Sequence, residues 1–297
     1  MQKLYLTISR KIKEVLFMKK FLFFLLLLSL FVCLCSCSGN DAMNRLELEV
    51  VHRMDGGYSV SVGNATCLSE ITIPKKIEKN KIDRISPSGF AGCSELERII
   101  IPEGITEIGE GAFTNCAELK EVVLPAGLTK IGAGAFERCS SLEKIIIPEG
   151  VVEIGENAFK NCSQLKEVVI LDGLTKIEKS CFEKCTRLES ITLPSTLLEI
   201  GSAAFMNCIR LKDLTIPDGT TIISYNAFNG CKAIEEVYIP LSVSTIYEGA
   251  FKDCTEIKTV YFEGDFKQWQ TVIGGSGIYL YHDTGLGHLH VEYNSKR

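Results

Sequence analysis

The sequence predicts a repeat solenoid, a right-handed coil of short parallel β-strands and short helical turns with a 23-residue period, capped at both ends. Cysteine recurs every 23 residues, phenylalanine stands three residues before each of these cysteines, and leucine or isoleucine stands three residues after. One unit cannot bury these apolar side chains alone, whereas stacked units can. The cysteine column is Cys93, Cys116, Cys139, Cys162, Cys185, Cys208, Cys231 and Cys254, beside phenylalanines from Phe90 to Phe251.

Each unit divides into three segments, as residues 142–162 illustrate. Residues 142–148 place Leu142, Ile145 and Ile147 where one side can be buried, and end at Pro148, which cannot continue a central ladder, so they form a short strand. Residues 149–155 turn at Gly150 and bury a second short segment. Residues 157–162 form a tight helical turn that directs alanine, phenylalanine and cysteine to the interior.

Two charge columns predict the register of the stack. Residues 23 apart are neighbours in a parallel stack, and in both columns the sign alternates from unit to unit. A slip of one unit would therefore place like charges side by side, although each exposed pair contributes only about 0.2–1 kcal/mol. The columns are Glu97, Lys120, Glu143, Lys166, Glu189, Lys212, Glu235 and Lys258, and Glu107, Lys130, Glu153, Lys176 and Glu199.

Residues 1–37 have the features of a lipoprotein signal peptide. A basic start at residues 18–20 precedes the apolar stretch 21–32, and translation could begin at Met18. The sequence around Cys37 resembles the lipobox of bacterial lipoproteins, in which cleavage precedes a lipidated cysteine. We therefore expect lipidation at Cys37, with an ordinary cleaved signal peptide as the alternative.

The net charge excludes one class of partner. Without residues 1–37 the chain has 26 basic and 36 acidic residues, a net charge near −10. Such a chain repels phosphate backbones and anionic lipid surfaces, so we expect no nucleic-acid partner. Membrane attachment would then depend on the lipid alone, which predicts an anchored protein of the bacterial cell envelope, at the outer membrane or the cell surface.

The segments that flank the repeats leave the pattern. Residues 38–66 are expected to be a tether followed by a β-hairpin cap, because residues 45–62 alternate around a turn at 55–57. The repeats occupy residues 67–262, and residues 263–297 are expected to cap the last coil with Phe266 and Trp269.

The repeat pattern resembles a known family. The sequence I-x-x-I-G-x-x-A-F-x-x-C-x-x-L-x-x-I-x-I-P, as in residues 105–124 and 128–148, is similar to the BspA-type, or Treponema-type, leucine-rich repeat. The resemblance covers about residues 68–262. It implies a curved solenoid on bacterial or protozoan surfaces that serves adhesion or protein binding, and it does not specify a ligand.

The repeat cysteines are too regular for catalysis. A thiol nucleophile needs a neighbouring base, and no histidine column accompanies the cysteines. The alternatives are packing as small apolar residues, disulfides between stacked neighbours, or metal binding, and packing is favoured. Cys181 replaces the usual alanine and is the thiol to check for a partner. In the tail, His288 and His290 would share a strand face, as metal ligands or as a solvated strand, with His282 nearby.

The outward middle position of each strand is the candidate binding surface. This column changes from aliphatic to Thr192, Thr215, Tyr238 and Tyr261, and exposed tyrosines suit recognition because their contact area costs little side-chain entropy. Tyr225 departs from its own column in the same half. We expect a surface protein that binds a protein or glycoprotein, possibly host-derived, through the concave sheet, with a glycan-binding accessory lipoprotein as the alternative. We predict no enzymatic activity, catalytic residue, metal site or cofactor.

Overall fold

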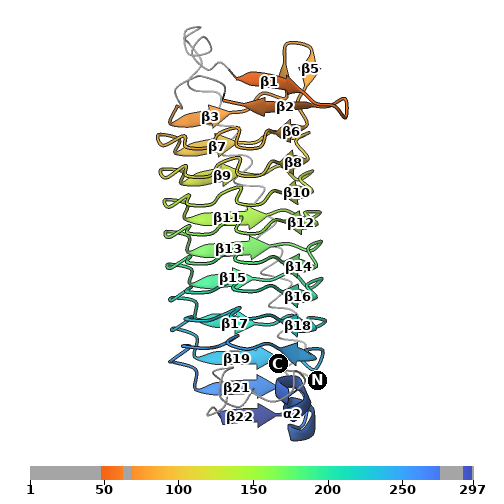
Figure 1. Ribbon diagram of the computed structural model, residues 1–297, viewed down its shortest axis with the longest axis vertical. Helices are drawn as coiled ribbons and strands as arrows, with labels where there is room; N and C mark the ends of the chain where they lie inside the picture. Colours follow the sequence, from red (N-terminus) through yellow and green to blue (C-terminus); the bar gives the residue numbers. More distant parts are fainter. Residues whose placement is uncertain (1–47, 63–67, 275–289, 296–297) are drawn as a thin grey trace, which may run out of the picture. The chain divides into compact units, whose positions relative to one another are not determined.

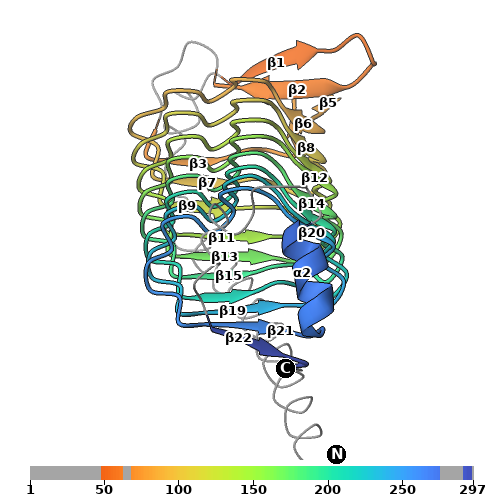
Figure 2. The ribbon, with the colours of Figure 1, turned by 60° about the horizontal axis from the view of Figure 1, so that its bottom comes forward.

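The chain winds into coils of 23 residues that stack along one axis (Figure 1). The computed structural model describes residues 48–62, 68–274 and 290–295. The signal peptide, Cys37 and the tether predicted at the N-terminus lie outside the described residues. Each coil contributes one longer strand, one shorter strand and one turn segment, so the stack has three walls (Figure 2).

The long-strand wall consists of parallel strands, and successive strands from β11 to β21 pair at a 23-residue register. It comprises a three-stranded sheet, β3-β7-β9, and a seven-stranded sheet, β11-β13-β15-β17-β19-β21-β22. The strands are β3 Glu70–Thr72, β7 Arg98–Ile100, β9 Glu121–Val123, β11 Lys144–Ile147, β13 Glu167–Ile170, β15 Ser190–Thr192, β17 Asp213–Thr215, β19 Glu236–Ile239, β21 Thr259–Phe262 and β22 His290–Tyr293.

The short-strand wall contains the second strand of each coil. Its sheets have the orders β1-β2-β6-β8-β10-β12 and β14-β16-β18-β20. The strands are β1 Glu49–His52, β2 Tyr58–Ser61, β6 Arg84–Ile85, β8 Glu107–Ile108, β10 Lys130–Ile131, β12 Glu153–Ile154, β14 Lys176–Ile177, β16 Glu199–Ile200, β18 Ile222–Ile223 and β20 Thr245–Ile246. The break between β12 and β14 occurs where Glu178 replaces the glycine found at Gly155, whose amide donates to the Ile131 carbonyl at 2.8 Å.

The predicted N-terminal hairpin is present. Strands β1 and β2 are antiparallel, and β2 then pairs in parallel with β6. The lengthened link of the first repeat forms a small hairpin, β4 Lys76–Ile77 and β5 Asn80–Lys81. Whether the N-terminal hairpin acts as a cap stays a prediction.

The C-terminal segment forms a helix and an additional strand. Helix α2, Phe266–Gly274, begins with a capping box, in which the Gln268 amide donates to Asp265 Oδ1 at 2.8 Å and the Asp265 amide donates to Gln268 Oε1 at 2.9 Å. Trp269 is buried with its ring 5.2 Å from that of Phe262, whereas Phe266 is half exposed. The covering role of Trp269 agrees with this packing, and that of Phe266 stays a prediction.

Eight phenylalanines form a continuous stack inside the coil. Their ring centroids are 5.1–5.4 Å apart from Phe90 to Phe251, and every ring is buried. Offset stacking of this kind adds about 0.5–1.5 kcal/mol per pair to the burial of the rings. The phenylalanine column therefore supplies the centre of the core.

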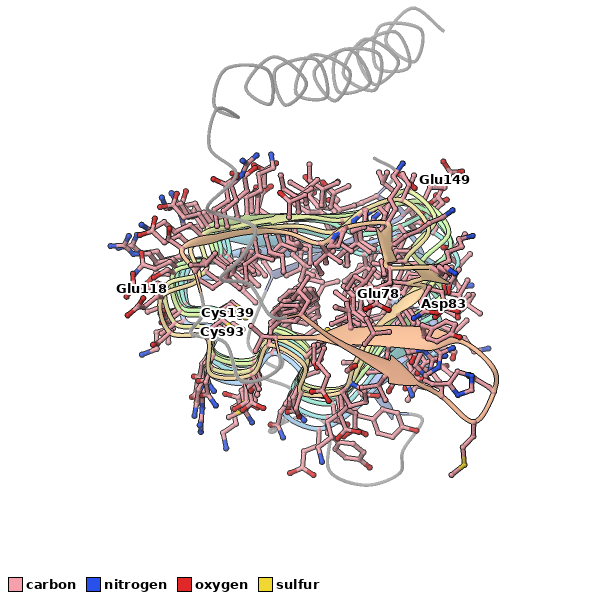
Figure 3. The ribbon with its side chains drawn as sticks, turned by 90° about the horizontal axis from the view of Figure 1, so that it is seen from above. Glu78, Asp83, Cys93, Glu118, Cys139 and Glu149 are labelled. Atoms are coloured by element: carbon pink, nitrogen blue, oxygen red, sulfur yellow. The ribbon has the colours of Figure 1, made fainter. Side chains whose placement is uncertain are left out.

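The repeat cysteines lie beside this stack and also make hydrogen bonds. Each Sγ from Cys116 to Cys254 donates to the phenylalanine carbonyl of the preceding coil at 3.1–3.2 Å. Cys181 and the seven column cysteines from Cys116 onward are free and buried, which confirms the packing role. Figure 3 labels Cys139, one of these cysteines, inside the coil. Cys93 differs, because it is disulfide-bonded.

The turn wall is the third wall, and left-handed residues recur on it in every coil. Gly111, Phe113 and Asn115 donate their amides to carbonyls of the next coil at 2.7–2.8 Å, while the intervening amides donate three residues back. The predicted helical turn is therefore a zigzag with positive φ at two positions. These positions are Ser88, Gly111, Gly134, Asn157, Ser180, Ala203, Asn226 and Gly249, and Gly92, Asn115, Arg138, Asn161, Lys184, Asn207, Gly230 and Asp253.

Ala203→Gly is expected to stabilise the protein. Ala203 has φ 54°, where a Cβ costs an L-residue roughly 1–2 kcal/mol, and its counterparts are glycine, asparagine or serine. We expect the free energy of unfolding to rise by about 1 kcal/mol in urea titrations. The matched control is Ala204→Gly in the same turn, where a buried methyl is lost and stability falls by about 1 kcal/mol. A loss of stability with Ala203→Gly would contradict the interpretation.

The charge columns form ion pairs between adjacent coils, which confirms the predicted register. In the two predicted columns each paired lysine contacts one glutamate of its column, as Lys120 contacts Glu97, so these two columns consist of separate pairs. A third column on the long strands, missed in the sequence, alternates in the same way. The pairs at 2.7–3.5 Å are Lys120–Glu97, Lys166–Glu143, Lys258–Glu235, Arg84–Glu107, Lys130–Glu153, Lys176–Glu199, Arg98–Glu121 and Lys144–Glu167.

Candidate functional site

The outer surface of the long-strand wall carries two columns of side chains. Both follow from the alternation of a β-strand, and the strand register holds them in line. The first outward column is Arg98, Glu121, Lys144, Glu167, Ser190, Glu236, Thr259 and His290. The second outward column is Ile100, Val123, Ile146, Val169, Thr192, Thr215, Tyr238, Tyr261 and Glu292.

The N-terminal half of this surface is aliphatic and electrically neutralised. Arg98 contacts both Glu70 and Glu121, at 2.8 and 2.9 Å, and Lys144 contacts Glu167 at 2.8 Å. The second outward column was predicted to be exposed throughout, and Val169 departs from this because only 5% of it is accessible. Basic residues end at Lys144 in these two columns apart from His290, so the two halves differ in charge.

The predicted residues Thr192, Thr215, Tyr238 and Tyr261 do lie in one column on the C-terminal half. Both threonines are exposed, and both tyrosines are partly exposed. Tyr238 and Tyr261 stack with their centroids 4.5 Å apart and their planes within 11°. We call these two residues the tyrosine pair.

Both hydroxyls of the tyrosine pair donate to one carboxylate, that of Glu236. The Tyr238 hydroxyl donates to Glu236 Oε2 at 3.3 Å, and the Tyr261 hydroxyl donates to Oε1 of the same group at 3.4 Å. Partial burial, together with Glu236 and Glu292, raises the pKa of the Tyr261 phenol above its ordinary value. The phenol therefore stays neutral at physiological pH and keeps its hydrogen-bond donor.

Strand β22 extends this surface beyond the repeats. Glu292 pairs in register with Tyr261, and His290 with Thr259, so the two columns continue into the tail. His290 is exposed and lies 3.6 Å from Glu292. The predicted tail strand is thus present and solvated, and it adds a carboxylate that sequence reasoning missed because the 23-residue period ends before it. His282 and His288 lie outside the described residues.

Tyr225 is not part of the same surface. It follows β18 of the short-strand wall, is 49% exposed, and has its ring 4.6 Å from that of Tyr247. Tyr247 was not predicted. The sequence feature that could have revealed it is a change in one repeat position, since Tyr247 occupies the place that Gly132 and Gly155 hold in earlier coils. The tyrosine pair and the contact between Tyr225 and Tyr247 therefore lie on different walls.

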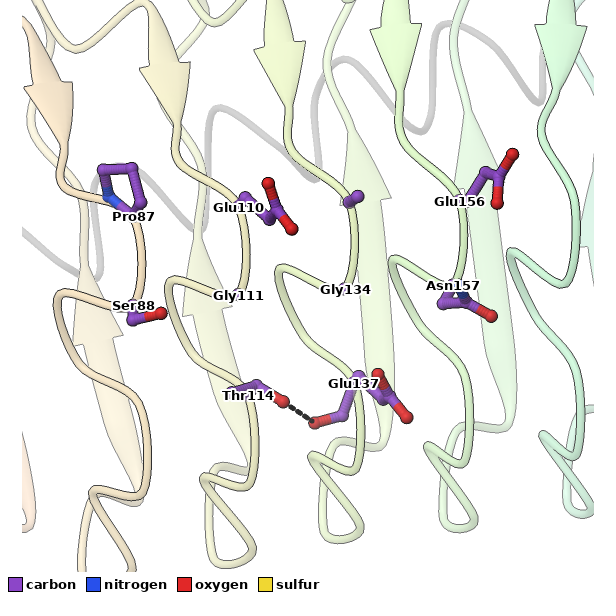
Figure 4. Close-up of a pocket in the computed structure, with 10 residues that line it drawn as sticks. Pro87, Ser88, Glu110, Gly111, Thr114, Gly134, Glu137, Glu156 and Asn157 are labelled. Atoms are coloured by element: carbon purple, nitrogen blue, oxygen red, sulfur yellow. Dashed lines mark hydrogen bonds between the residues drawn. The ribbon is translucent and has the colours of Figure 1, made fainter.

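A groove of about 280 Å³ lies along the turn wall of the N-terminal coils (Figure 4). The carboxylates of Glu110, Glu137 and Glu156 line it, and the Thr114 hydroxyl donates to the Glu137 carbonyl at 3.3 Å. Within the residues that the structure describes, no cluster of histidine, cysteine and carboxylate groups could hold a metal ion. In the same ranges, no helix is long and apolar enough to cross a bilayer.

Regular coils that stack on one another and differ mainly in their surface side chains are the architecture of leucine-rich repeat proteins. The chain belongs to the family of the BspA type Leucine rich repeat region, whose model matches residues 62–189 and 175–273 in six copies. This confirms the resemblance seen in the sequence. Curated proteins yield no match to the sequence.

Solved structures of bacterial leucine-rich repeat proteins are similar to this chain. The T. pallidum protein TpLRR is 26% identical with a TM-score of 0.45, and the match covers 56% of this chain and 88% of that one. A leucine rich cell surface protein from Faecalibacterium prausnitzii A2-165 is 21% identical with a TM-score of 0.34, covering 76% and 95%. The pneumococcal vaccine antigen PcpA is 18% identical with a TM-score of 0.40, covering 76% and 87%.

Proposed function

We propose that the protein is a lipid-anchored binding or adhesion protein of the bacterial cell envelope, at the outer membrane or the cell surface. Its partner is a protein or glycoprotein that contacts the C-terminal half of the long-strand wall. The family supports a protein-binding scaffold. Anchoring rests on the sequence around Cys37, and the disulfide at Cys93 supports an oxidising compartment.

The tyrosine pair is the observation that carries this proposal. Two adjacent aromatic side chains on an outward sheet surface are not needed for packing, since Thr192 and Thr215 occupy the same column. Tyrosine is enriched among the residues that dominate binding energy at interfaces. The stacked rings also restrict each other, so a partner meets an ordered surface.

The charges around the pair indicate the chemistry of the partner. Glu236 makes no ion pair with another described residue, and Glu292 has only His290 at 3.6 Å. Carboxylates beside aromatic rings suit lysine and arginine side chains, because these form ion pairs with the carboxylates and stack on the rings. We therefore propose a partner that presents basic residues to the tyrosine pair.

The test compares Tyr238→Ala/Tyr261→Ala with the parent chain. The full chain in detergent micelles is probed with an array of peptides that vary in lysine and arginine content. We expect binding of basic peptides to fall at least tenfold in the variant, and parent binding to weaken as salt rises. The control is Ile100→Ala/Ile146→Ala, which truncates the same column in other coils and leaves binding unchanged. Unaltered peptide binding by the tyrosine variant would rule out this surface.

A glycan-binding accessory lipoprotein is the second candidate. It is favoured by the separate patch of Tyr225 and Tyr247, because an exposed tyrosine ring can stack on a sugar. A glycan array probed with the full chain separates the two functions. Glycan binding that is lost in Tyr225→Ala/Tyr247→Ala and retained in the tyrosine-pair variant would favour this alternative.

A further inference from the structure

Strand β1 is an open edge of the short-strand wall. Within the described part of the chain β1 pairs only with β2, which leaves its other side facing outward at the N-terminal end of the stack (Figure 2). Val51 is 42% exposed, and Glu49 and His52 are also exposed. An edge strand of this kind presents a row of backbone groups that another strand can pair with.

The hairpin register shows which backbone groups face outward. The Arg53 amide donates to the Gly57 carbonyl at 2.9 Å, and hydrogen-bonded and non-hydrogen-bonded pairs alternate along an antiparallel ladder. Val51 opposite Ser59 is therefore a bonded pair. Val50 and His52 accordingly direct their N–H and C=O groups away from β2.

Within the described residues, β1 has no lysine, proline or bulge that would prevent pairing. Natural edge strands are protected by lysine, proline, a bulge or a covering segment. The sequence of β1, Glu-Val-Val-His, contains neither lysine nor proline, and all four residues pair with β2 without a bulge. Two consecutive β-branched residues further favour an extended strand.

We propose that β1 pairs with β1 of a second copy of this chain, in an antiparallel and symmetric dimer. Two-fold symmetry requires that the same strand meets itself, which is the commonest arrangement of homo-oligomers. In the proposed register Val51 lies opposite Val51 of the second copy on the two-fold axis. Val50 then exchanges backbone hydrogen bonds with His52 of the second copy.

Charges favour this register over the others that the outward groups allow, since an axis at Val50 would leave Glu49 opposite Val51 of the second copy without an ion pair. With Val51 on the axis, Glu49 lies opposite Arg53 of the second copy, on the same face of the sheet. The Arg53 guanidinium retains N–H groups beyond those bonded to Asp55 and Asp83. Moving the axis to His52 places Glu49 opposite Asp55, and moving it to Glu49 places two glutamates together. Both of these registers bring like charges into contact.

The dimer would join two stacks end to end. The order of strands would continue from β8, β6, β2 and β1 into the same strands of the second copy in reverse, as one sheet. The long-strand walls and both tyrosine pairs stay outside the contact, because β1 belongs only to the short-strand wall. This partner is thus independent of the ligand proposed above.

Cysteine cross-linking in the full chain tests the register. Opposed residues of a non-hydrogen-bonded antiparallel pair have Cα atoms about 4.5 Å apart, a separation that a disulfide can span. Val51→Cys, expressed in a bacterial envelope and treated with a mild oxidant, is expected to yield at least tenfold more covalent dimer on non-reducing gels than the parent chain. Val50→Cys is the matched control, because it faces His52 rather than itself and stays at the parent level.

A second variant tests the backbone contact. His52→Pro removes an amide that β2 does not use, so β1 can still pair with β2. Val51→Cys/His52→Pro is expected to lose the covalent dimer at least tenfold, with the fluorescence of Trp269 unchanged. The parent chain in detergent is expected to sediment as two chains, and His52→Pro as one. No dimer with Val51→Cys, equal dimer with Val50→Cys, or cross-links mainly to other proteins would overturn the proposal.

Discussion

Above about pH 10 the free energy of unfolding is expected to fall by about 10 kcal/mol for each unit of pH. Burial raises the pKa of seven thiols above the ordinary value of 9.0, to about 12 for Cys116 and Cys162. In the unfolded chain these thiols lose their protons from about pH 9, whereas the folded chain keeps them. Each contributes about 1.4 kcal/mol per pH unit, and their stabilising effect is complete below pH 9 and lost as the pH rises towards 12.

The alkaline transition is therefore expected to be steep. Domains of ordinary stability have about 5–15 kcal/mol, so the fold would be lost within about two pH units above pH 9. Urea titrations at intervals between pH 8 and pH 11 measure the slope. Cys162→Ala removes one buried thiol and is expected to reduce the slope by about 1.4 kcal/mol per pH unit. A free energy of unfolding that stays constant from pH 8 to pH 11 would contradict the role of burial.

Phe159→Ala is expected to lower the free energy of unfolding by about 3–5 kcal/mol. Phe159 is fully buried, and its ring lies 5.2 and 5.3 Å from those of Phe136 and Phe182. The substitution leaves a cavity in the middle of the stack and removes both ring contacts. Because each coil contacts only its neighbours, this coil is also where the stack is expected to separate.

Two probes distinguish a weakened coil from a uniformly weakened protein. Far-UV circular dichroism reports on all coils, while the fluorescence of Trp269 reports on the C-terminal end. We expect the two unfolding curves to diverge in Phe159→Ala. The matched control is Val152→Ala in a neighbouring segment, where the side chain is 62% exposed and the change stays within about 0.5 kcal/mol. If the two unfolding curves coincided and the free energy of unfolding fell by less than about 1 kcal/mol, the view that each coil is stabilised only by its neighbours would be wrong.

The regular part of the fold could be predicted because each column repeats one physical requirement. Phenylalanine, cysteine and leucine recur at the positions that are buried. The alternating charges indicate which residues of adjacent coils are neighbours. The left-handed positions were harder to predict, because arginine, lysine and alanine also occupy them, as at Arg138 and Ala203. Local propensity alone would not place such residues at positive φ. The hydrogen bonds between coils on the turn wall hold them in that conformation.

The candidate site could be predicted only in part. Thr192, Thr215, Tyr238 and Tyr261 were expected on one surface because a strand alternates its side chains, and the register aligns them. Tyr225 was grouped with them from its position in the chain, but it lies on another wall. Glu292 could not be assigned because its strand returns to the sheet from outside the repeat, a long-range pairing that no local pattern encodes.

The alternating ion pairs also restrict how the length of this protein can change during evolution. Loss or duplication of a single coil places two lysines or two glutamates side by side in several columns at once. Gain or loss of two adjacent coils preserves every alternation and leaves the junction equivalent to the others. The inherited unit of this gene is therefore expected to be a pair of coils.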